Sequence, residues 1–326
     1  MTPAPDPALV ERFRRDLEAL TAAAPTPERK LGVAVSGGAD SLALLLLAHA
    51  AYPGAIEAAT VDHGLRSEAA EEAAWVQHIC TAHGVPYEVL RGPAIAPTQQ
   101  DARVLRYALL GDWAAGRLTW LATAHQQDDV AESLLMRAQR GAGVGGLAAM
   151  VRMRALPPSD AFLVRPLLDW SRAELAAVAA AAGLAPIDDP ANRSPRYDRS
   201  RARALLAATP ALSPARLARA AHNLRDAEAA LAWAAEREWA VRAQSDGGAL
   251  TFDMAGLPYE LRRRLVLRAI DHIRCESGLR GAIREDGVDR LIAALEAGGV
   301  ATLGGVRAGA KSGRWRFSLA PARRSH

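Results

Sequence analysis

Six residues near the start of the chain, Ser36-Gly37-Gly38-Ala39-Asp40-Ser41, combine the residue types that bind phosphate. Glycine lets backbone N–H groups approach an anion closely, and the N-terminal end of a following helix favours negative charge. The stretch lacks the lysine of a GxxxxGK[ST] loop, which argues against ordinary γ-phosphoryl transfer. The alternative is a strand-to-helix turn in which the glycines serve geometry and Asp40 or Ser41 caps the helix.

Acidic and imidazole side chains recur further along the chain. Asp40 offers the oxygen ligand that Mg²⁺ prefers. Asp62 and His63 follow a second apolar run, and His125 follows a fourth, so these side chains can face a bound nucleotide or a reacting base. The alternatives are a turn aspartate, a surface histidine and, for His125 with Asp129, a His-x-x-x-Asp metal pair.

Asp129 and Glu132 lie three positions apart in a stretch typical of a helix, hence on one helix face. Two carboxylates on one face can hold a substrate ammonium group. Alternatively, Asp128 and Asp129 favour the helix N-terminus, and Glu132 pairs with Arg137 or solvent. These residues by themselves leave both interpretations open.

The elements that would position these side chains alternate between two kinds. Short apolar runs typical of strands alternate with longer stretches typical of helices, which indicates βαβ units and a doubly wound, mostly parallel α/β sheet. Such sheets bind ligands beyond the carboxyl ends of their strands. The Ser36 turn, Asp62-His63 and His125 should therefore share one edge. The strands are expected at 31–35, 56–61, 86–90 and 118–123, and the helices between them at 40–51, 67–83 and 98–116.

Changes in composition along the chain suggest its division into domains. We expect an N-terminal helix over 1–24, the α/β catalytic domain over 25–190 and a basic linker over 191–208. Residues 209–326 should form a smaller, mainly helical domain that ends in short strands joined by glycine turns. A G-x-G-x-x-G match at 141–146 follows a helix-like stretch instead of a strand, so it indicates a mobile loop near the site and not a dinucleotide site.

The overall composition excludes several classes of protein. The chain has 326 residues and a net charge of +4 from 40 basic and 36 acidic residues, which does not by itself indicate a nucleic-acid binder. Its two cysteines, Cys80 and Cys275, cannot build a disulfide framework or a four-thiolate metal site. The charged start does not resemble a secretory signal, and the longest apolar run is too short for a membrane span. We therefore expect a cytoplasmic protein.

Arginine is unevenly distributed, and this distribution bears on RNA binding. Residues 196–219 hold six arginines and residues 262–284 hold seven. Clustered guanidinium groups suit RNA phosphates and can stack on unpaired bases, although solvated arginine faces are the alternative. The candidates nearest the catalytic domain are Arg199, Arg201 and Arg203, and one predicted helix adds Arg103, Arg106 and Tyr107.

With these residues collected, the chain resembles the N-type ATP pyrophosphatase (PP-loop) family, whose SGGxDS signature is met by residues 36–41. Further stretches make it similar to one branch, the tRNA(Ile)-lysidine synthetases. It looks like a short form of that branch, because it ends where longer relatives carry another domain. The stretches are VDHGLR (61–66), DARVLRY (101–107), TAHQQDDVAESLLMRAQRGAGVGGLAAM (123–150), VRPLLDWSRAEL (164–175) and DDPANRSPRYDRSRAR (188–203). Two departures are Ser200 in place of an asparagine and Ser133 in place of a threonine.

The resemblance implies a two-step ligation. ATP adenylates the C2 oxygen of the cytidine at the wobble position of tRNA(Ile) and releases pyrophosphate, and the ε-amine of free L-lysine then displaces AMP to leave lysidine. It implies ATP in the Ser36–Ser41 turn, Mg²⁺ on Asp40, and lysine recognition by Asp129 and Glu132. Asp62, His63 and His125 would act with Asp40 in catalysis.

Other functions and the oligomeric state stay open. A different PP-loop enzyme could modify tRNA or amidate a small molecule, and a non-enzymatic protein could keep the fold to bind tRNA. Thiolation of cytidine by relatives of this kind needs several cysteines, which this chain lacks.

Overall fold

The computed structural model describes residues 3–62, 69–92, 98–148, 150–187, 198–279, 281, 285–311 and 313–321. The internal contacts divide the chain into two compact units, Met1–Arg225 and Asp226–His326. The sequence placed a boundary near residue 208, whereas the first unit continues to residue 225. His63, one of the predicted site residues, lies outside the described residues.

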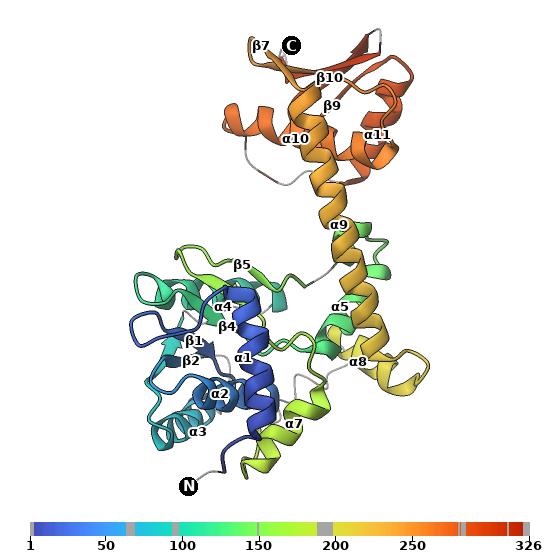
Figure 1. The fold of residues 1–326 in the computed structure, drawn as a ribbon. Helices are drawn as coiled ribbons and strands as arrows, with labels where there is room; N and C mark the ends of the chain where they lie inside the picture. The colour runs from blue at the N-terminus through green and yellow to red at the C-terminus, as the bar shows by residue number, and fades with distance from the viewer. Residues whose placement is uncertain are drawn as a thin grey trace. The chain divides into compact units, whose positions relative to one another are not determined.

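A six-stranded sheet forms the centre of the first unit (Figure 1). Its strand order is β3-β2-β1-β4-β6-β5, and every pairing is parallel except that of β5 with β6. The four predicted strands are confirmed, while β5 and β6 were not predicted. The strands are β1 (Leu31–Ala34), β2 (Ile56–Asp62), β3 (Tyr87–Arg91), β4 (Trp120–Ala122), β5 (Met153–Ala155) and β6 (Phe162–Val164).

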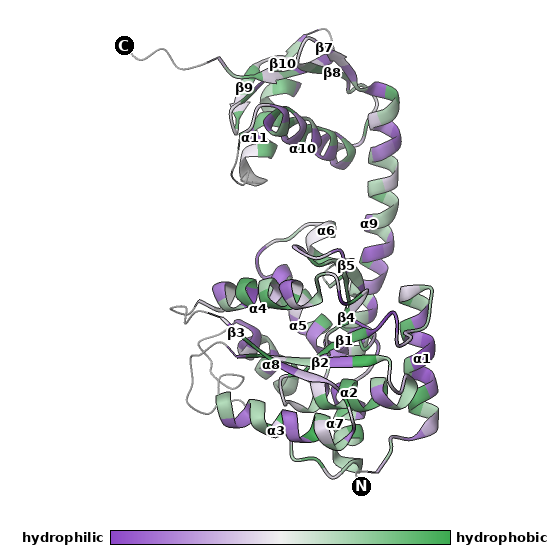
Figure 2. Cartoon of the chain, turned by 90° about the vertical axis from the view of Figure 1, so that its left-hand side faces the viewer, coloured by the Kyte–Doolittle hydropathy of each residue, from purple (hydrophilic) through white to green (hydrophobic). Residues whose placement is uncertain are grey.

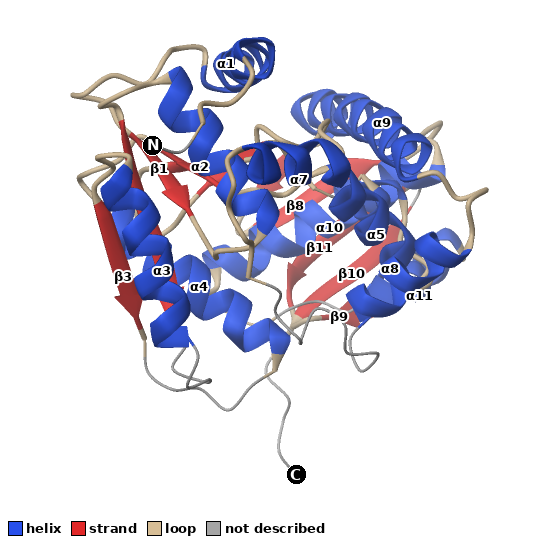
Figure 3. Ribbon diagram, turned by 90° about the horizontal axis from the view of Figure 1, so that it is seen from below, coloured by secondary structure: helices blue, strands red, loops and turns tan. Residues whose placement is uncertain are grey.

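Helices cover both faces of this sheet. On one face lie α1 (Pro7–Thr21), α2 (Ala39–Ala51), α3 (Ala69–Ala82) and α7 (Arg172–Ala181), and on the other lies α4 (Gln99–Ala114). Helix α2 is apolar around its whole circumference, because it is enclosed between the sheet, α1 and α7 and buries every residue from 41 to 48. Figure 3 shows α1 beside α2.

Helices α5 (Gln127–Ala138) and α6 (Val144–Leu147) lie between β4 and β5, and helices α8 (Asp198–Ala208) and α9 (Pro214–Arg242) follow the last strand of the sheet. Helix α5 is followed by the short α6, so the glycine-rich stretch 141–146 has no strand before it and lacks the context of a dinucleotide site. Helix α8 lies within the predicted linker. The start of α9 packs Ala218 and Ala221 against Val130 and Leu134 of α5. Polar and apolar residues alternate along α9 (Figure 2).

The second unit contains helices α10 (Tyr259–Glu276) and α11 (Glu285–Glu296) and an antiparallel sheet. The sheet order is β7-β8-β11-β10-β9, and its core includes Phe252, Phe317 and Ile270. Gly304 and Gly305 both have positive φ, as the tight turn of the β9–β10 hairpin requires. The predicted terminal strands are confirmed, with two further strands before α10. The strands are β7 (Gln244–Asp246), β8 (Ala249–Asp253), β9 (Val300–Leu303), β10 (Val306–Lys311) and β11 (Arg314–Leu319).

The fold class predicted from the sequence is thus confirmed: a doubly wound, mostly parallel α/β sheet is followed by a smaller region that combines helices with a small sheet. Both cysteines are free, Cys80 buried in the first unit and Cys275 exposed in the second. Among the helices in the described ranges, none combines the length and apolar character needed to cross a bilayer.

Candidate active site

The phosphate-binding turn connects β1 to α2. Ser36 N–H donates to Ser41 Oγ (3.1 Å), and Ser41 Oγ–H donates to the carbonyl of Gly38 (2.9 Å). The Ser41 hydroxyl is therefore used to close the turn. The turn continues directly into the N-terminus of α2, whose first N–H groups lack carbonyl acceptors within the helix. This arrangement suits an anion.

Gly37 is the residue on which the shape of this turn depends. Its φ is +82°, and a Cβ added there would lie 2.3 Å from Cδ1 of Ile187. Ile187 N–H also donates to the carbonyl of Gly37 (3.0 Å). Glycine is required both by the left-handed backbone and by the isoleucine packed under it. Gly38 has an ordinary φ of −72°, and a Cβ there would come no closer than 3.8 Å to another atom.

Asp40 and Asp129 bring two carboxylates into one neighbourhood from different helices. Burial and the nearby charge of Asp129 raise the pKa of Asp40 to about 6, although Arg172 and Gln126 act in the opposite direction. Burial likewise raises the pKa of Asp129. The Oδ1 atom of Asp40 is buried and accepts no hydrogen bond from the described residues. A cation bound beside Asp40 would therefore favour its charged form.

The N-terminus of α5 positions Asp129. Gln126 precedes the helix and is fully buried, and its Oε1 accepts from Asp128 N–H (2.5 Å). Gln126 N–H donates in return to Asp129 Oδ2 (3.2 Å), which makes a reciprocal capping arrangement. The cap fixes the start of α5 and holds the Asp129 carboxylate next to the carboxyl edge of the sheet.

Glu132, one turn further along α5, lies among three arginines. Its side chain is fully buried, and its Oε1 accepts from Arg203 Nε (2.8 Å) and from Arg172 Nη2 (3.0 Å). Arg199 Nε lies 3.6 Å from Glu132 Oε2. Two of the arginines expected to contact tRNA are thus turned towards Glu132. The third, Arg201, is more exposed and pairs with Asp198.

His125 follows β4 and is surrounded by positive charge. Burial, followed by the charges of Arg165, Arg199, Arg103 and Arg106, lowers the pKa of His125 well below its ordinary value. The imidazole is therefore neutral at physiological pH. Its Nδ1 shares a hydrogen bond with the hydroxyl of Thr123 (3.0 Å), which fixes the plane of the ring.

The ring of Tyr107 on α4 lies among the same guanidinium groups. Arg154 and Arg103 approach the ring centroid at 4.7 and 5.0 Å, and Arg165 interacts with the hydroxyl. Although burial opposes its ionisation, the guanidinium groups of Arg103 and Arg165 lower the pKa of Tyr107. The region around His125 and Tyr107 thus favours an anion.

Asp62 lies at the expected edge of the sheet. It ends β2, pairs in register with Arg91 at the end of β3, and its Oδ2 lies 3.6 Å from Arg91 Nε. The sheet order places this strand next to β1, which leads into the phosphate turn. The catalytic roles of Asp62 and His63 stay predictions.

Sequence reasoning missed three residues of this site. Gln126 caps α5, Arg172 joins Glu132, and Arg165 contributes the largest single charge effect on His125. Two of these three residues could have been noticed in the sequence. Arg165 interrupts an apolar run, and Arg172 is a cation in the first turn of α7, where the helix dipole disfavours positive charge.

The comparisons with known proteins agree with this geometry. A family model described as the PP-loop domain matches residues 9–209. A tRNA(Ile)-lysidine synthase of Novosphingobium aromaticivorans is 45% identical over 322 residues, which cover 96% of this chain and 94% of that protein. A second, from Zymomonas mobilis, is 43% identical and covers 90% of each chain. The chain belongs to the tRNA(Ile)-lysidine synthase family.

One solved structure also shares the fold. The U34-tRNA thiolase NcsA from Methanococcus maripaludis, with its [4Fe-4S] cluster, gives a TM-score of 0.53 over 67% of this chain and 80% of that chain, at 20% identity. This likeness shows the fold alone. The match to the PP-loop domain also supports the use of ATP, which the Ser36–Ser41 turn predicts.

Proposed function

We propose that this chain ligates free L-lysine to C2 of the cytidine at the wobble position of tRNA(Ile) through a tRNA adenylate, releasing AMP and pyrophosphate. The observation that carries the proposal is that Asp40, which follows the phosphate-binding glycines, lies close enough to the buried Asp129 for the charge of Asp129 to raise its pKa, while the charges of several arginines lower the pKa of His125. This arrangement offers acidic groups for cationic ligands and basic groups for RNA within one site. We further propose that this reaction takes place in the cytoplasm.

The phosphate turn and Asp40 would serve the adenylation step. Backbone N–H groups at the start of α2 would face the phosphates, and the turn contains no lysine of the kind that contacts a γ-phosphate. Mg²⁺ fits Asp40, because its buried Oδ1 accepts no hydrogen bond from the described residues and is the kind of ligand that this ion prefers. When bound, Mg²⁺ would offset charge on the leaving pyrophosphate.

Asp129 and Glu132 would hold the ammonium groups of lysine. Asp129 has a raised pKa because it is buried, so a cation beside it restores the charged form. Glu132 already accepts hydrogen bonds from Arg203 and Arg172, so lysine would share this carboxylate with the arginines. The two acids therefore differ in how directly they can contact the substrate.

His125 would act beside the reacting base. Burial and the surrounding guanidinium groups disfavour the imidazolium form, so the neutral ring would orient the base by a hydrogen bond and would not hold the proton that the lysine amine loses. Contacts to the RNA backbone and unpaired bases would come from Arg103, Arg106, Tyr107, Arg199, Arg201 and Arg203.

Two other functions remain as alternatives, and one experiment separates all three. The protein is incubated with ATP, labelled lysine and total tRNA, and the products are AMP, pyrophosphate and label at one cytidine of tRNA(Ile). Another PP-loop enzyme that modifies tRNA or amidates a small molecule would release AMP without incorporating lysine. A tRNA-binding protein without activity would release neither product. Formation of ADP and orthophosphate would overturn the whole assignment.

A further inference from the structure

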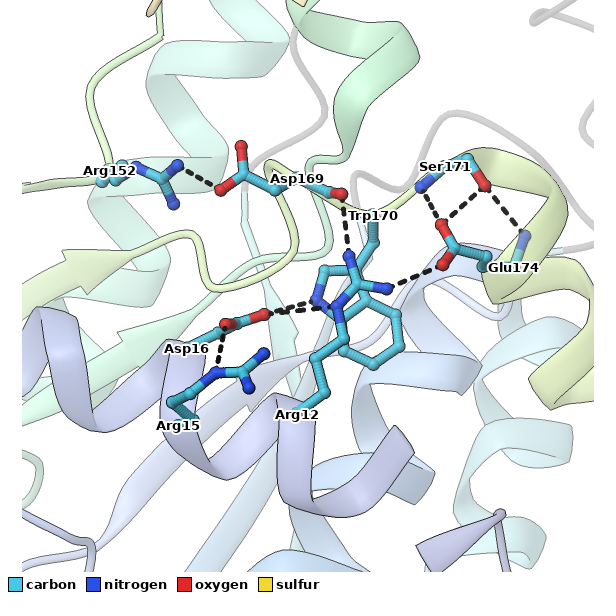
Figure 4. Close-up of polar contacts among 8 residues, drawn as sticks. All are labelled: Arg12, Arg15, Asp16, Arg152, Asp169, Trp170, Ser171 and Glu174. Carbon is cyan, nitrogen blue, oxygen red and sulfur yellow. Dashed lines mark hydrogen bonds and ion pairs between the residues drawn. The ribbon is translucent and has the colours of Figure 1, made fainter. Parts of the chain in front are cut away.

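Arg12 and Asp16 join the N-terminal helix to the segment that enters α7 (Figure 4). Arg12 Nη1 donates to Glu174 Oε1 (2.7 Å), and Arg12 Nη2 donates to the carbonyl of Asp169 (2.9 Å). Its guanidinium also lies 4.1 Å from the centroid of the Trp170 ring. Arg12 therefore holds three residues of this segment at once.

Asp16, one turn further along α1, completes the attachment. Trp170 Nε1 donates to Asp16 Oδ2 (2.9 Å), and Arg12 Nε lies 3.7 Å from the same oxygen. Trp170 is fully buried, and this hydrogen bond satisfies Nε1, the only polar atom of its side chain. The bond also fixes the orientation of the indole ring. Glu174 is fixed from its other side, because its Oε2 accepts from Ser171 N–H (2.8 Å) in the capping box of α7.

The opposite side of the same segment faces the lysine site. The carbonyl of Trp170 accepts from Gln127 N–H (2.9 Å) at the start of α5, and Arg172 N–H donates to Asp128 Oδ1 (3.3 Å). The Arg172 side chain continues to Glu132 (3.0 Å), and its charge lowers the pKa of Asp40 and of Asp129. Residues 169–172 thus connect α1 to the acids of the site.

We propose that Arg12, together with Asp16, is a positioning residue for the lysine step. It holds Trp170 and Glu174 so that Arg172 is kept against Glu132 and beside Asp129. This inference rests on the proposed function, and it assigns to the N-terminal helix a role in selecting the second substrate and not only in packing. Neither α1 residue would touch lysine, ATP or RNA.

The position of the Arg172 guanidinium determines how much positive charge lies beside Glu132. A guanidinium that moves away from Glu132 leaves this buried carboxylate to Arg203 and Arg199. The net charge around an incoming lysine ammonium group then changes, although Asp129 and Glu132 are both still present. The phosphate turn has no contact with Arg12 among the described residues, so adenylation should continue.

The experiment compares Arg12→Met with Arg15→Met in the full chain. Methionine keeps the apolar stem of the arginine against Trp170 and removes its hydrogen bonds. Arg15 is a matched control on the same helix, because its side chain is 72% exposed and contacts only Asp16, at 3.7 Å, among the residues described. Lysine incorporation is measured over a series of lysine concentrations, beside pyrophosphate release at saturating ATP.

For Arg12→Met we expect the KM for lysine to rise roughly 3- to 30-fold, the range found for residues that act through a network. Pyrophosphate release at saturating ATP should fall less than lysine incorporation does, because Arg172 acts on Asp40 only through its charge. Arg12→Lys should recover part of the loss, because one ammonium can replace one of the two hydrogen bonds. Arg15→Met should equal the wild type.

A double-variant comparison tests the route through Arg172. If Arg12 acts by placing Arg172, then Arg12→Met should add no further loss in an Arg172→Met background. Additive losses, an unchanged KM in Arg12→Met, or a parallel fall of pyrophosphate release and lysine incorporation at an equal melting temperature would overturn the proposal. Failure of the proposed function is distinct, because the wild type and Arg15→Met would then incorporate no lysine at all.

Discussion

Arg203 and Glu132 are joined by a hydrogen bond of 2.8 Å from Nε to Oε1, although 71 positions separate them in the sequence. The bond connects α8, at the end of the arginine-rich stretch, to the centre of α5. Glu132 is buried completely, whereas the Arg203 side chain is 35% exposed. One of the arginines that sequence reasoning assigned to RNA therefore also belongs to the neighbourhood of the predicted lysine site.

Variants that neutralise Asp129 or Glu132 should differ from each other in stability and lose similar amounts of lysine affinity. Asp129→Asn and Glu132→Gln should each weaken lysine binding by about two orders of magnitude, because an ammonium loses a buried counter-charge. Glu132→Gln should also lower the melting temperature, since three arginines lose their shared acceptor. Asp129→Asn should not, because burial already disfavours its charge. Lysine titrations and thermal denaturation check both statements.

In both variants pyrophosphate release from ATP and tRNA should persist, because adenylation precedes the attack of lysine. Loss of pyrophosphate release together with lysine incorporation, at saturating lysine, would instead assign these carboxylates to the metal or to the fold.

Arg201 and Arg203 should separate RNA binding from lysine recognition. Arg201→Ala should lower the salt slope of log affinity for tRNA by about 0.7 to 0.9 per lost phosphate contact and leave the KM for lysine unchanged. Arg203→Ala should raise the KM for lysine, because it removes a hydrogen bond to Glu132. Salt titrations of tRNA binding provide the measurement. Unchanged affinity and slope in a variant with alanine at 199, 201 and 203 would show that these arginines do not contact tRNA.

Asp40 should make the unliganded protein less stable as pH rises. Its pKa is raised from 3.8 to about 6 in the folded chain, so the folded state binds more protons than the unfolded state between these values. The stabilising contribution is complete below pH 3.8 and is lost as pH rises through about 6, by at most about 3 kcal/mol. Asp40→Asn should therefore melt at a higher temperature than wild type at pH 7 and at the same temperature near pH 4.

Mg²⁺ with ATP provides the control for this prediction. The pair should raise the melting temperature of the wild type at pH 7 and have little effect on Asp40→Asn, whose amide is a poorer ligand for the ion. A variant that is less stable than wild type at pH 7 would contradict the assigned burial of the carboxylate.

Gly37 and Gly38 should respond differently to alanine. Gly37→Ala places a side chain in the left-handed region and against Ile187, so it should destabilise the unliganded protein by about 1–2 kcal/mol. Gly38→Ala should leave stability nearly unchanged and weaken ATP binding, because its backbone is ordinary and its new methyl group would face the phosphates. Thermal denaturation and ATP titration of both variants test this contrast. Equal losses of stability would show that both glycines serve only the turn.

The parallel sheet and its first helices could be predicted because their signals are local. Leu31–Ala34 and the apolar run of α2 carry patterns that depend only on neighbouring residues. The same holds for the Ser36–Ser41 turn, whose chemistry is contained in six consecutive positions. Strand β5, by contrast, lies at the edge of the sheet, is largely exposed and carries no apolar run that would predict it.

The electrostatic partners could not be predicted, because they come from distant parts of the chain. Arg172 lies 40 positions from Glu132, and Arg12 lies 162 positions from Glu174. In the sequence Glu132 had Arg137 as its nearest candidate, but Arg137 instead donates to the carbonyl of Gly146 (2.6 Å). Only the tertiary structure shows which arginines share one carboxylate.

Ile187 packs beneath Gly37, and Arg199 reaches Glu132, so the chain on either side of residues 188–197 is anchored to the phosphate turn at one end and to α5 at the other. We expect a ligand that displaces one of these two anchors to alter the affinity of the other for its own ligand. Thermodynamic reciprocity then requires that ATP change the affinity for RNA by the same factor by which RNA changes the affinity for ATP. The coupling between the two substrates can therefore be measured in either titration.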